Sequence, residues 1–264
     1  MPLPVELPEP FHEEMSASDS PLIGAWVSAG SATNAEILAA AGFDFLLVDA
    51  EHSPYGLETV THLLRATDGY GPARIVRVPS NDTVLIKQYL DLGAQNIMVP
   101  MVESASEAAA AVAAMHYPPR GVRGVGSALA RSSRWNAVEG YLDRASETVN
   151  LTVQIESARG VANAAEIAAV DGVDQIFVGP ADLAASLGHL GRPRHPEVVA
   201  AIDQAFAAAA KAGKPVGVNC FDRAQAREFL AAGASFVLVG ADVQLLSQAA
   251  RNLADEFTQK GSNL

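Results

Sequence analysis

Three ionisable side chains directly follow a continuous apolar run in the first quarter of the chain. Residues 43–54 read Phe-Asp-Phe-Leu-Leu-Val-Asp-Ala-Glu-His-Ser-Pro, so the run ends in Asp49, Glu51 and His52. An apolar run without alternation is typical of a strand covered on both faces, as in a parallel sheet. Functional groups of such sheets collect just past the carboxyl ends of the strands. A loop whose polar residues merely cap the following helix fits this segment equally well, so the other strands must decide.

Two further carboxylates, Glu156 and Asp182, each follow an apolar run of the same kind. If these runs are neighbouring strands of one barrel, the two carboxylates repel each other unless a proton or a cation lies between them. Two carboxylates with water in the remaining positions are the pattern expected for Mg²⁺ or Mn²⁺, with Co²⁺ and Zn²⁺ as further candidates. The alternative is a structural ion pair with an arginine such as Arg77 or Arg159. Because both positions fall on the functional face, we favour a divalent metal held by Glu156 and Asp182.

Candidates for proton transfer and for charge stabilisation lie on two other strands. Asp49 precedes His52 on one loop, so its carboxylate could orient the imidazole and raise its basicity, as in a general base. Arg77 lies within the apolar segment Ile-Val-Arg-Val-Pro. A guanidinium there is costly unless it is paired with a protein carboxylate or an anionic substrate. This placement would permit Arg77 to stabilise a developing enolate oxygen.

The positions of the lysines argue against a Schiff-base mechanism. None of the four lysines lies at the carboxyl end of a predicted strand, where the Schiff-base lysine of a barrel aldolase would have to be. Carbonyl chemistry would therefore have to use the metal. The loops after the last two predicted strands also lack the glycine-rich sequence of barrel phosphate sites. We expect the anionic group of the substrate to be a carboxylate.

The elements that must position these residues are eight short apolar runs, most of them separated by alanine-rich helical stretches. Eight strand-helix units in this order predict an α/β fold, a parallel (β/α)8 TIM barrel. The alternative is an open doubly wound sheet, which the even count and the absence of a Gly-x-Gly-x-x-Gly motif disfavour. The predicted strands are residues 22–27, 45–49, 74–78, 96–99, 151–155, 175–178, 215–218 and 236–239.

The 264 residues are consistent with one domain, because α/β barrels of about 250 residues are routinely single domains. Residues 1–20 are rich in proline and acids, and we predict a flexible lead-in before a single barrel domain at 21–264. A long loop at about 116–150 interrupts the regular spacing, and loops of that length are usually functional or disordered. Its Arg123, Arg131 and Arg134 are candidates for recognising a distal carboxylate of the substrate. Ion pairs at a subunit interface explain them equally well.

Charge and hydropathy exclude several kinds of binding partner. A net charge of −12 and a pI near 4.9 argue against nucleic acid and anionic membranes, which select basic patches. No segment approaches the 18 uninterrupted apolar residues of a membrane span, and the start of the chain lacks the features of a signal peptide. A single cysteine forms no internal disulfide and no multi-cysteine metal site. These features predict a cytoplasmic protein that acts on small molecules.

Five segments carry a family resemblance. They are Val-Asp-Ala-Glu-His-Ser-Pro at 48–54, Arg-Val-Pro at 77–79, Arg-Gly-Val-Gly-Ser-Ala-Leu-Ala-Arg-Ser-Ser-Arg-Trp at 123–135, Gln-Ile-Glu-Ser at 154–157 and Gly-Pro-Ala-Asp-Leu at 179–183. In this order they resemble the HpcH/HpaI aldolase family. Its members are class II, metal-dependent pyruvate aldolases that include 4-hydroxy-2-oxoheptanedioate aldolase and 2-dehydro-3-deoxyglucarate aldolase.

The resemblance implies a role for each matched residue. Glu156 and Asp182 would ligate the metal, His52 with Asp49 would form the acid-base dyad, and Arg77 would contact the keto oxygen. Pyruvate would chelate the metal, framed by Gln154 and by the backbone of Gly179, Pro180, Ala181 and Asp182. The resemblance also implies a hexamer, a trimer of dimers in which the last helix is exchanged between neighbours. From the residues alone, 243–257 is an amphipathic helix.

The predicted function is reversible cleavage of a 4-hydroxy-2-oxo acid, such as 4-hydroxy-2-oxoheptanedioate, to pyruvate and an aldehyde through a metal-stabilised pyruvate enolate. This is a carbon-carbon lyase reaction of the kind used in aromatic catabolism. One alternative keeps the site and decarboxylates oxaloacetate through the same enolate. Another is a barrel that binds a keto acid without chemistry, which the presence of Asp49, His52 and Arg77 disfavours.

Overall fold

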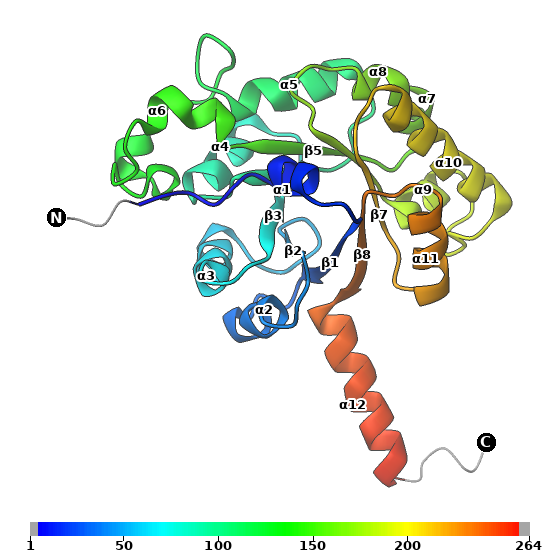
Figure 1. Ribbon diagram of the computed structural model, residues 1–264. Helices are drawn as coiled ribbons and strands as arrows, with labels where there is room; N and C mark the ends of the chain where they lie inside the picture. Colours follow the sequence, from blue (N-terminus) through cyan, green and yellow to red (C-terminus); the bar gives the residue numbers. More distant parts are fainter. Residues whose placement is uncertain (1–4, 259–264) are drawn as a thin grey trace.

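Eight parallel strands close into a barrel in which each strand pairs with its neighbours in chain order and β8 pairs with β1. The computed structural model describes residues 5–258, and Figure 1 shows helices surrounding the barrel. This confirms the predicted (β/α)8 fold. The strands are β1 (Leu22–Val27), β2 (Phe45–Asp49), β3 (Ala73–Arg77), β4 (Asn96–Val99), β5 (Asn150–Ile155), β6 (Gln175–Val178), β7 (Val216–Asn219) and β8 (Phe236–Ala241).

Helices connect successive strands and cover the outside of the barrel. Their apolar faces pack on the outward side chains of the strands and form the larger hydrophobic core, in which many residues are alanine. The helices between strands are α2 (Ala32–Ala39), α3 (Leu57–Thr67), α4 (Thr83–Asp91), α5 (Ala105–Met115), α6 (Tyr141–Arg144), α7 (Ala158–Ala162), α8 (Ala164–Ala168), α9 (Pro180–Ser186), α10 (Pro196–Lys211) and α11 (Arg223–Ala231).

Aromatic rings fill the interior of the barrel toward the amino ends of the strands. Phe45, Phe177 and Phe236 are fully buried, and the ring centroids of Phe236 lie 5.8 Å from those of both other residues. Gly24 and Gly217 make room for them, because a Cβ at either position would collide with the ring of Phe45 or Phe236. This second core fixes the strands that carry the functional side chains.

The N-terminal segment contains a packed helix, so the prediction of a flexible lead-in is corrected. Helix α1 (Phe11–Ala17) lies across the amino end of the barrel, and its Phe11 is fully buried. The Phe11 ring lies 5.1 Å from that of Phe45 and 5.4 Å from that of Phe236, while its backbone N–H donates to Asn96 at 2.8 Å. Proline content suggested disorder, but one aromatic side chain ties the segment down. Residues 1–4 lie outside the described part of the chain.

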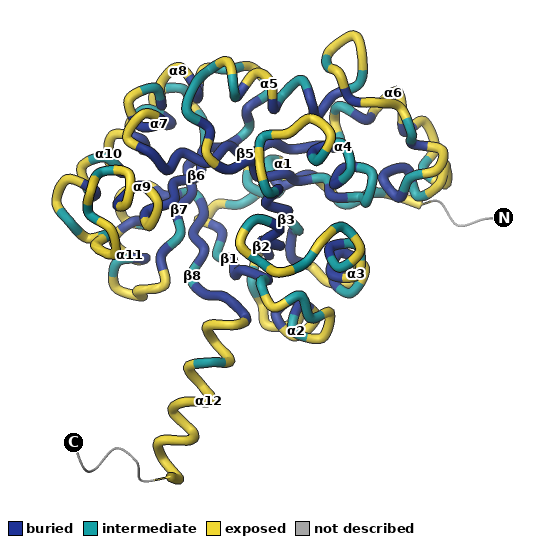
Figure 2. The backbone as a smooth tube through the Cα atoms, turned by 180° about the vertical axis from the view of Figure 1, so that it is seen from behind, coloured by how far each residue is buried: buried dark blue, intermediate teal, exposed yellow. Residues whose placement is uncertain are grey.

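The last helix, α12 (Asp242–Thr258), projects away from the barrel (Figures 1 and 2). Figure 2 shows it exposed along nearly its whole length. Its exposed apolar side chains are Val243, Leu245, Leu246, Leu253 and Phe257. The predicted amphipathic helix is therefore present, and its apolar side chains are not covered by the chain's own barrel. Among residues 5–258, no helix has both the length and the apolar character needed to cross a membrane.

Candidate active site at the carboxyl ends of the strands

The carboxyl ends of four strands carry the predicted functional side chains. Asp49 and Arg77 end β2 and β3 and are directly paired in the register of these strands. On the other side, Gln154 lies in β5, Glu156 follows that strand, and Asp182 lies in the first turn of α9, after β6. Because the strands are parallel, all of these residues reach the same end of the barrel, as predicted.

Glu156 is held in a tight polar cradle. Its side chain is 2 % exposed, its Oε1 accepts the backbone N–H of Met101 at 2.9 Å, and its Oε2 accepts a hydrogen bond from Nε2 of Gln154. A Cβ on Gly179 would lie 2.5 Å from Oε2 of Glu156 and 2.8 Å from Nε2 of Gln154, so only glycine fits there. Gly179 is thus required by the packing of the carboxylate.

Asp182 and Glu51 bring two more negative charges close to Glu156. The pKa of Glu156 is raised from 4.5 to about 7, mainly by burial and also by the nearby charges of Asp182 and Glu51, against the opposing effects of the Met101 N–H and of Arg77. Arg77 pairs with Asp49 and Glu51, and Arg159 with Glu103, so neither arginine is the ion-pair partner of Glu156 or Asp182 that the alternative required. Among residues 5–258, neither Glu156 nor Asp182 forms an ion pair with an arginine or a lysine.

A divalent cation fits this arrangement. Oε1 of Gln154 is buried without a hydrogen-bond partner among residues 5–258, so an unused oxygen acceptor lies beside the carboxylates. Oxygen donors with excess negative charge are the set that hard cations such as Mg²⁺ and Mn²⁺ prefer. Asp182 is exposed and Glu156 is buried, which gives one ligand open to solvent and one fixed in the barrel. Glu156 and Asp182 could therefore hold the ion.

The raised pKa of Glu156 predicts how the affinity for a metal depends on pH. A cation and a proton compete for this carboxylate, and the proton is bound below about pH 7. The affinity of the metal-stripped protein for Mn²⁺ is expected to fall about tenfold for each pH unit below 7 and to level off above it. Titration calorimetry from about pH 5.5 to pH 8.5 measures this. An affinity that stays constant over this range would contradict the assignment of Glu156.

Arg77 is buried and fixed on three sides. Its Nε donates to Oδ1 of Asp49 at 2.9 Å, its Nη1 lies 2.9 Å from Oε2 of Glu51, and its Cζ lies 4.4 Å from the ring centroid of Trp26. Burial raises the pKa of Glu51, while Arg77 lowers it. The guanidinium is therefore held by two carboxylates and an aromatic face, which fixes where its charge lies.

Two of these contacts were not assigned from the sequence. Glu51 was recognised only as a polar residue at the end of the strand, although it lies in the same short segment as Asp49 and His52. Trp26 was not singled out, and its position in the last part of β1 was the available signal. Its indole N–H also donates to Oδ1 of Asn219 at 2.9 Å, which links the ends of β1 and β7 beside Arg77.

The imidazole of His52 does not contact Asp49, which corrects the predicted dyad within this chain. Oδ1 of Asp49 accepts the backbone N–H groups of Glu51 at 3.1 Å and of His52 at 3.4 Å, so the carboxylate shapes the loop. The His52 side chain is 64 % exposed, and its Nε2 lies 3.9 Å from Oε2 of Glu51. Asp49 is used by Arg77 and by the loop backbone, and the imidazole remains accessible to a substrate.

The arginines of the long loop lie elsewhere. Arg123 is 1 % exposed, donates to Asp91 at 3.0 Å and packs over the ring of Tyr117. Asp91 ends α4 just before β4 begins, so this ion pair lies toward the amino ends of the strands. The structure therefore does not bring Arg123 to the substrate face, and its expected contact with substrate is corrected to a buried ion pair.

Arg131 and Arg134 both pair with Asp68, which follows α3 just before β3, at 2.5 and 3.4 Å. Short helical turns order much of the loop around them. Within one chain both arginines are paired with Asp68, whereas the second explanation placed their ion pairs at a subunit interface.

Fold and site together define an α/β-barrel enzyme whose acidic side chains meet at the carboxyl ends of the strands. The family model for HpcH/HpaI aldolase/citrate lyase matches residues 22–249. The chain therefore belongs to the HpcH/HpaI aldolase/citrate lyase family, which confirms the resemblance.

Individual relatives agree with this assignment. The hydroxypyruvate/pyruvate aldolase of Deinococcus radiodurans is 51% identical over 263 residues, covering 98% of this chain and 95% of the relative. The 4-hydroxy-2-oxo-heptane-1,7-dioate aldolase of Salmonella dublin is 48% identical over 90% of both chains. An HpcH/HpaI aldolase/citrate lyase family structure from Burkholderia cenocepacia, 42% identical, superposes with a TM-score of 0.90 over 93% of this chain and 97% of the other.

Proposed function

We propose that this protein is a divalent-metal-dependent aldolase that cleaves a 4-hydroxy-2-oxo acid to pyruvate or hydroxypyruvate and an aldehyde. The observation that carries this proposal is the buried, uncompensated carboxylate of Glu156 beside Asp182, at the same barrel end as Arg77. The name of the Salmonella dublin relative, a 4-hydroxy-2-oxo-heptane-1,7-dioate aldolase, supports this reaction. The name of the Deinococcus radiodurans relative contains both pyruvate and hydroxypyruvate, the two three-carbon products proposed here. Mg²⁺ and Mn²⁺ suit the oxygen ligands best.

Glu156 and Asp182 would hold the cation, which when bound supplies Lewis-acid polarisation of the 2-oxo group. Gln154 and the start of α9, from Gly179 through Pro180 and Ala181, would frame the three-carbon donor. Arg77, fixed by Asp49 and Glu51, would stabilise the negative charge that develops on the keto oxygen as the bond between C3 and C4 breaks. The aldehyde half would then leave from the side of His52.

His52 would take the proton from the 4-hydroxyl during cleavage and return it during condensation, directly or through water. Replacing His52 by Ala is expected to lower kcat for cleavage by about 10²- to 10⁴-fold. Decarboxylation of oxaloacetate by the same variant should fall much less, because this reaction has no hydroxyl proton to remove. Steady-state assays of the two reactions measure this, with His62→Ala on the exposed face of α3 as the control. Equal losses in both reactions would contradict the role of His52 at the 4-hydroxyl.

Within the same proposal, α12 packs on a second copy of the chain, as in an exchanged-helix dimer that assembles into a hexamer. The exposed apolar side chains of α12 support it, because an isolated helix with Leu246, Leu253 and Phe257 in water gains by burial against a partner. Light scattering on the wild-type chain and on a Leu253→Asp/Phe257→Asp variant tests it. A wild-type chain that is monomeric at micromolar concentration would refute the assembly.

The reaction class is tested by the release of pyruvate from 4-hydroxy-2-oxoheptanedioate after EDTA treatment, with and without restored Mg²⁺, Mn²⁺, Co²⁺ or Zn²⁺. Condensation of pyruvate and of hydroxypyruvate with a panel of aldehydes follows under the same conditions. Activity that returns with a metal supports the aldolase. Activity with oxaloacetate but with no aldehyde or 4-hydroxy acid would favour a decarboxylase, and failure to bind either 2-oxo acid would overturn the proposal.

A further inference from the structure

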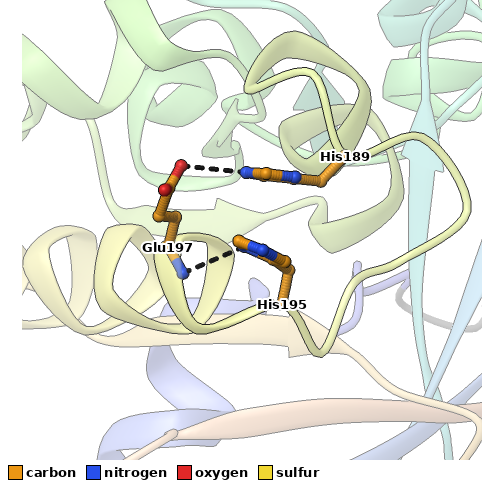
Figure 3. Close-up of side chains that lie close together, drawn as sticks. All are labelled: His189, His195 and Glu197. Carbon is orange, nitrogen blue, oxygen red and sulfur yellow. Dashed lines mark hydrogen bonds and ion pairs between the residues drawn. The ribbon is translucent and has the colours of Figure 1, made fainter.

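A second group of metal-ligating side chains lies outside the catalytic cluster, in the connection between α9 and α10. His189, His195 and Glu197 come together there, and one ligand atom from each lies within 4.8 Å of the other two (Figure 3). His189 follows the end of α9, whereas His195 is the residue before Pro196, with which α10 begins. The group therefore joins the two ends of one loop on the same side of the barrel as Asp182.

The side-chain contacts that these ligand atoms make lie within the group itself. Nε2 of His189 lies 2.9 Å from Oε2 of Glu197, and Nδ1 of His189 is buried without a partner among residues 5–258. The two rings stack with centroids 3.5 Å apart and planes inclined by 18°, so both present an edge toward Glu197 (Figure 3). Nδ1 of His195 accepts a long hydrogen bond, 3.4 Å, from the backbone N–H of Glu197.

We propose that His189, His195 and Glu197 form a binding site for one divalent transition metal ion of the Zn²⁺ type. Two imidazoles with one carboxylate are a ligand set that suits Zn²⁺, Co²⁺, Ni²⁺ or Cu²⁺, whereas Mg²⁺ and Mn²⁺ prefer oxygen. Three protein ligands leave a coordination position for water. The two imidazoles thus favour Zn²⁺ and related ions more strongly than the oxygen ligands of Glu156 and Asp182 do.

The change of geometry required is local. Ligand atoms around a tetrahedral Zn²⁺ with bonds of about 2.0–2.1 Å lie about 3.3 Å apart, so the contact between His189 and Glu197 needs to open only slightly. His195 must turn out of the stack and give up its long hydrogen bond to the backbone. Arg194 in the same loop does not oppose a cation with its full charge, because it pairs with Asp222 at 2.7 Å.

A bound ion would fix the wall of a pocket next to the catalytic loop. His195 lines an open pocket of about 620 Å³ together with Pro180 and Ala181, which precede Asp182. Asn219, at the end of β7, and the following Cys220 and Phe221 also line this pocket. By joining residues 189 and 195, the ion would hold both ends of the segment that closes this pocket on one side.

The site is tested by equilibrium dialysis of Zn²⁺ against the full chain with Glu156→Gln and Asp182→Asn, which removes the other candidate metal ligands. About one Zn²⁺ per chain is expected to remain bound. Adding His189→Ala, His195→Ala or Glu197→Gln should lower the affinity at least tenfold, whereas His62→Ala should leave it unchanged. With Co²⁺ as the probe, the same three substitutions should abolish the ligand-field absorption band.

Glu197→Gln changes only one exposed side chain at the start of α10, so a loss of binding in this variant with unchanged circular dichroism is not explained by unfolding. The proposal is overturned if the variant lacking Glu156 and Asp182 as ligands binds no Zn²⁺. It is equally overturned if bound Zn²⁺ persists unchanged when both histidines are replaced. No catalytic activity enters either measurement, so these outcomes are independent of the proposed reaction.

Discussion

Replacing Glu156 by Gln is expected to lower metal-dependent pyruvate release by about a thousandfold or more, and also to make the metal-free protein more stable. The activity is lost because a neutral amide is a poor replacement for an ionised ligand, and Lewis-acid polarisation contributes several kcal/mol to such reactions. Asp182→Asn should cause a comparable loss of activity. Its side chain is exposed, so we expect no gain in stability.

The gain in stability follows from the pKa of Glu156. This pKa is about 7 in the folded chain and 4.5 ordinarily, so the folded state binds the proton more tightly than the unfolded state does. The resulting stabilisation is complete below pH 4.5 and is lost as the pH rises through 7, where the carboxylate becomes a buried charge. Gln carries no such charge, so at about pH 8 the variant should be more stable by up to about 3 kcal/mol.

Urea unfolding of EDTA-treated protein at about pH 5 and pH 8 measures the stability effect, and the metal-restored cleavage assay measures the activity. Glu147→Gln, at an exposed glutamate on the loop between α6 and β5, is the matched control and should change neither quantity. Wild-type activity of Glu156→Gln without added metal would show that Glu156 does not act through a cation. A variant less stable than wild type at pH 8 would show that the carboxylate is already compensated.

Replacing Arg77 by Ala is expected to lower kcat/KM by about 10²- to 10³-fold and to destabilise the fold by about 3–5 kcal/mol. Stability falls because the substitution leaves Asp49 and Glu51 without their shared partner in a largely buried site. Activity falls because the charge beside the developing oxyanion is removed. Both effects come from one guanidinium that serves the fold and the site together.

Arg77→Lys separates the two effects. The ammonium restores a positive charge between Asp49 and Glu51, so much of the stability should return. It cannot reproduce the planar fork that contacts both carboxylates while lying 4.4 Å from the Trp26 ring, so activity should remain low. Urea unfolding and steady-state kinetics on both variants measure this. Near-wild-type kcat/KM in Arg77→Lys would show that a point charge is enough and that the fixed guanidinium is not required.

The strands were predictable because each is a buried apolar run that ends at polar, glycine or proline residues. All eight predicted strands are present, and their bounds differ from the predicted ones by at most two residues at either end. Helix α1 was missed because its local sequence, Phe-His-Glu-Glu-Met-Ser-Ala after several prolines, has only Phe11 and Met15 as large apolar residues. The packing that orders it is with residues far along the chain.

The site was predictable at the level of which strand ends meet, since parallel register brings Asp49 beside Arg77. Which carboxylates pair with Arg77 was not predictable, because a guanidinium on β3 can reach carboxylates on both neighbouring strands. Asp49 was assigned to the imidazole of His52, and in the structure it binds Arg77 and two backbone N–H groups instead. Strand order does not determine such choices, which depend on side-chain conformation.

The aromatic rings of Phe11, Phe45, Phe177 and Phe236 at the amino end of the barrel determine the order in which parts of the chain can fold during synthesis. Phe11 precedes β1 in the chain, yet one of the rings it packs against, Phe236, belongs to β8. The helix that carries Phe11 therefore has no complete docking surface until β8 has emerged from the ribosome. Until then the Phe11 side chain is exposed and must be kept from contacts with other proteins. We expect the barrel to close and Phe11 to pack into it in one late, cooperative step.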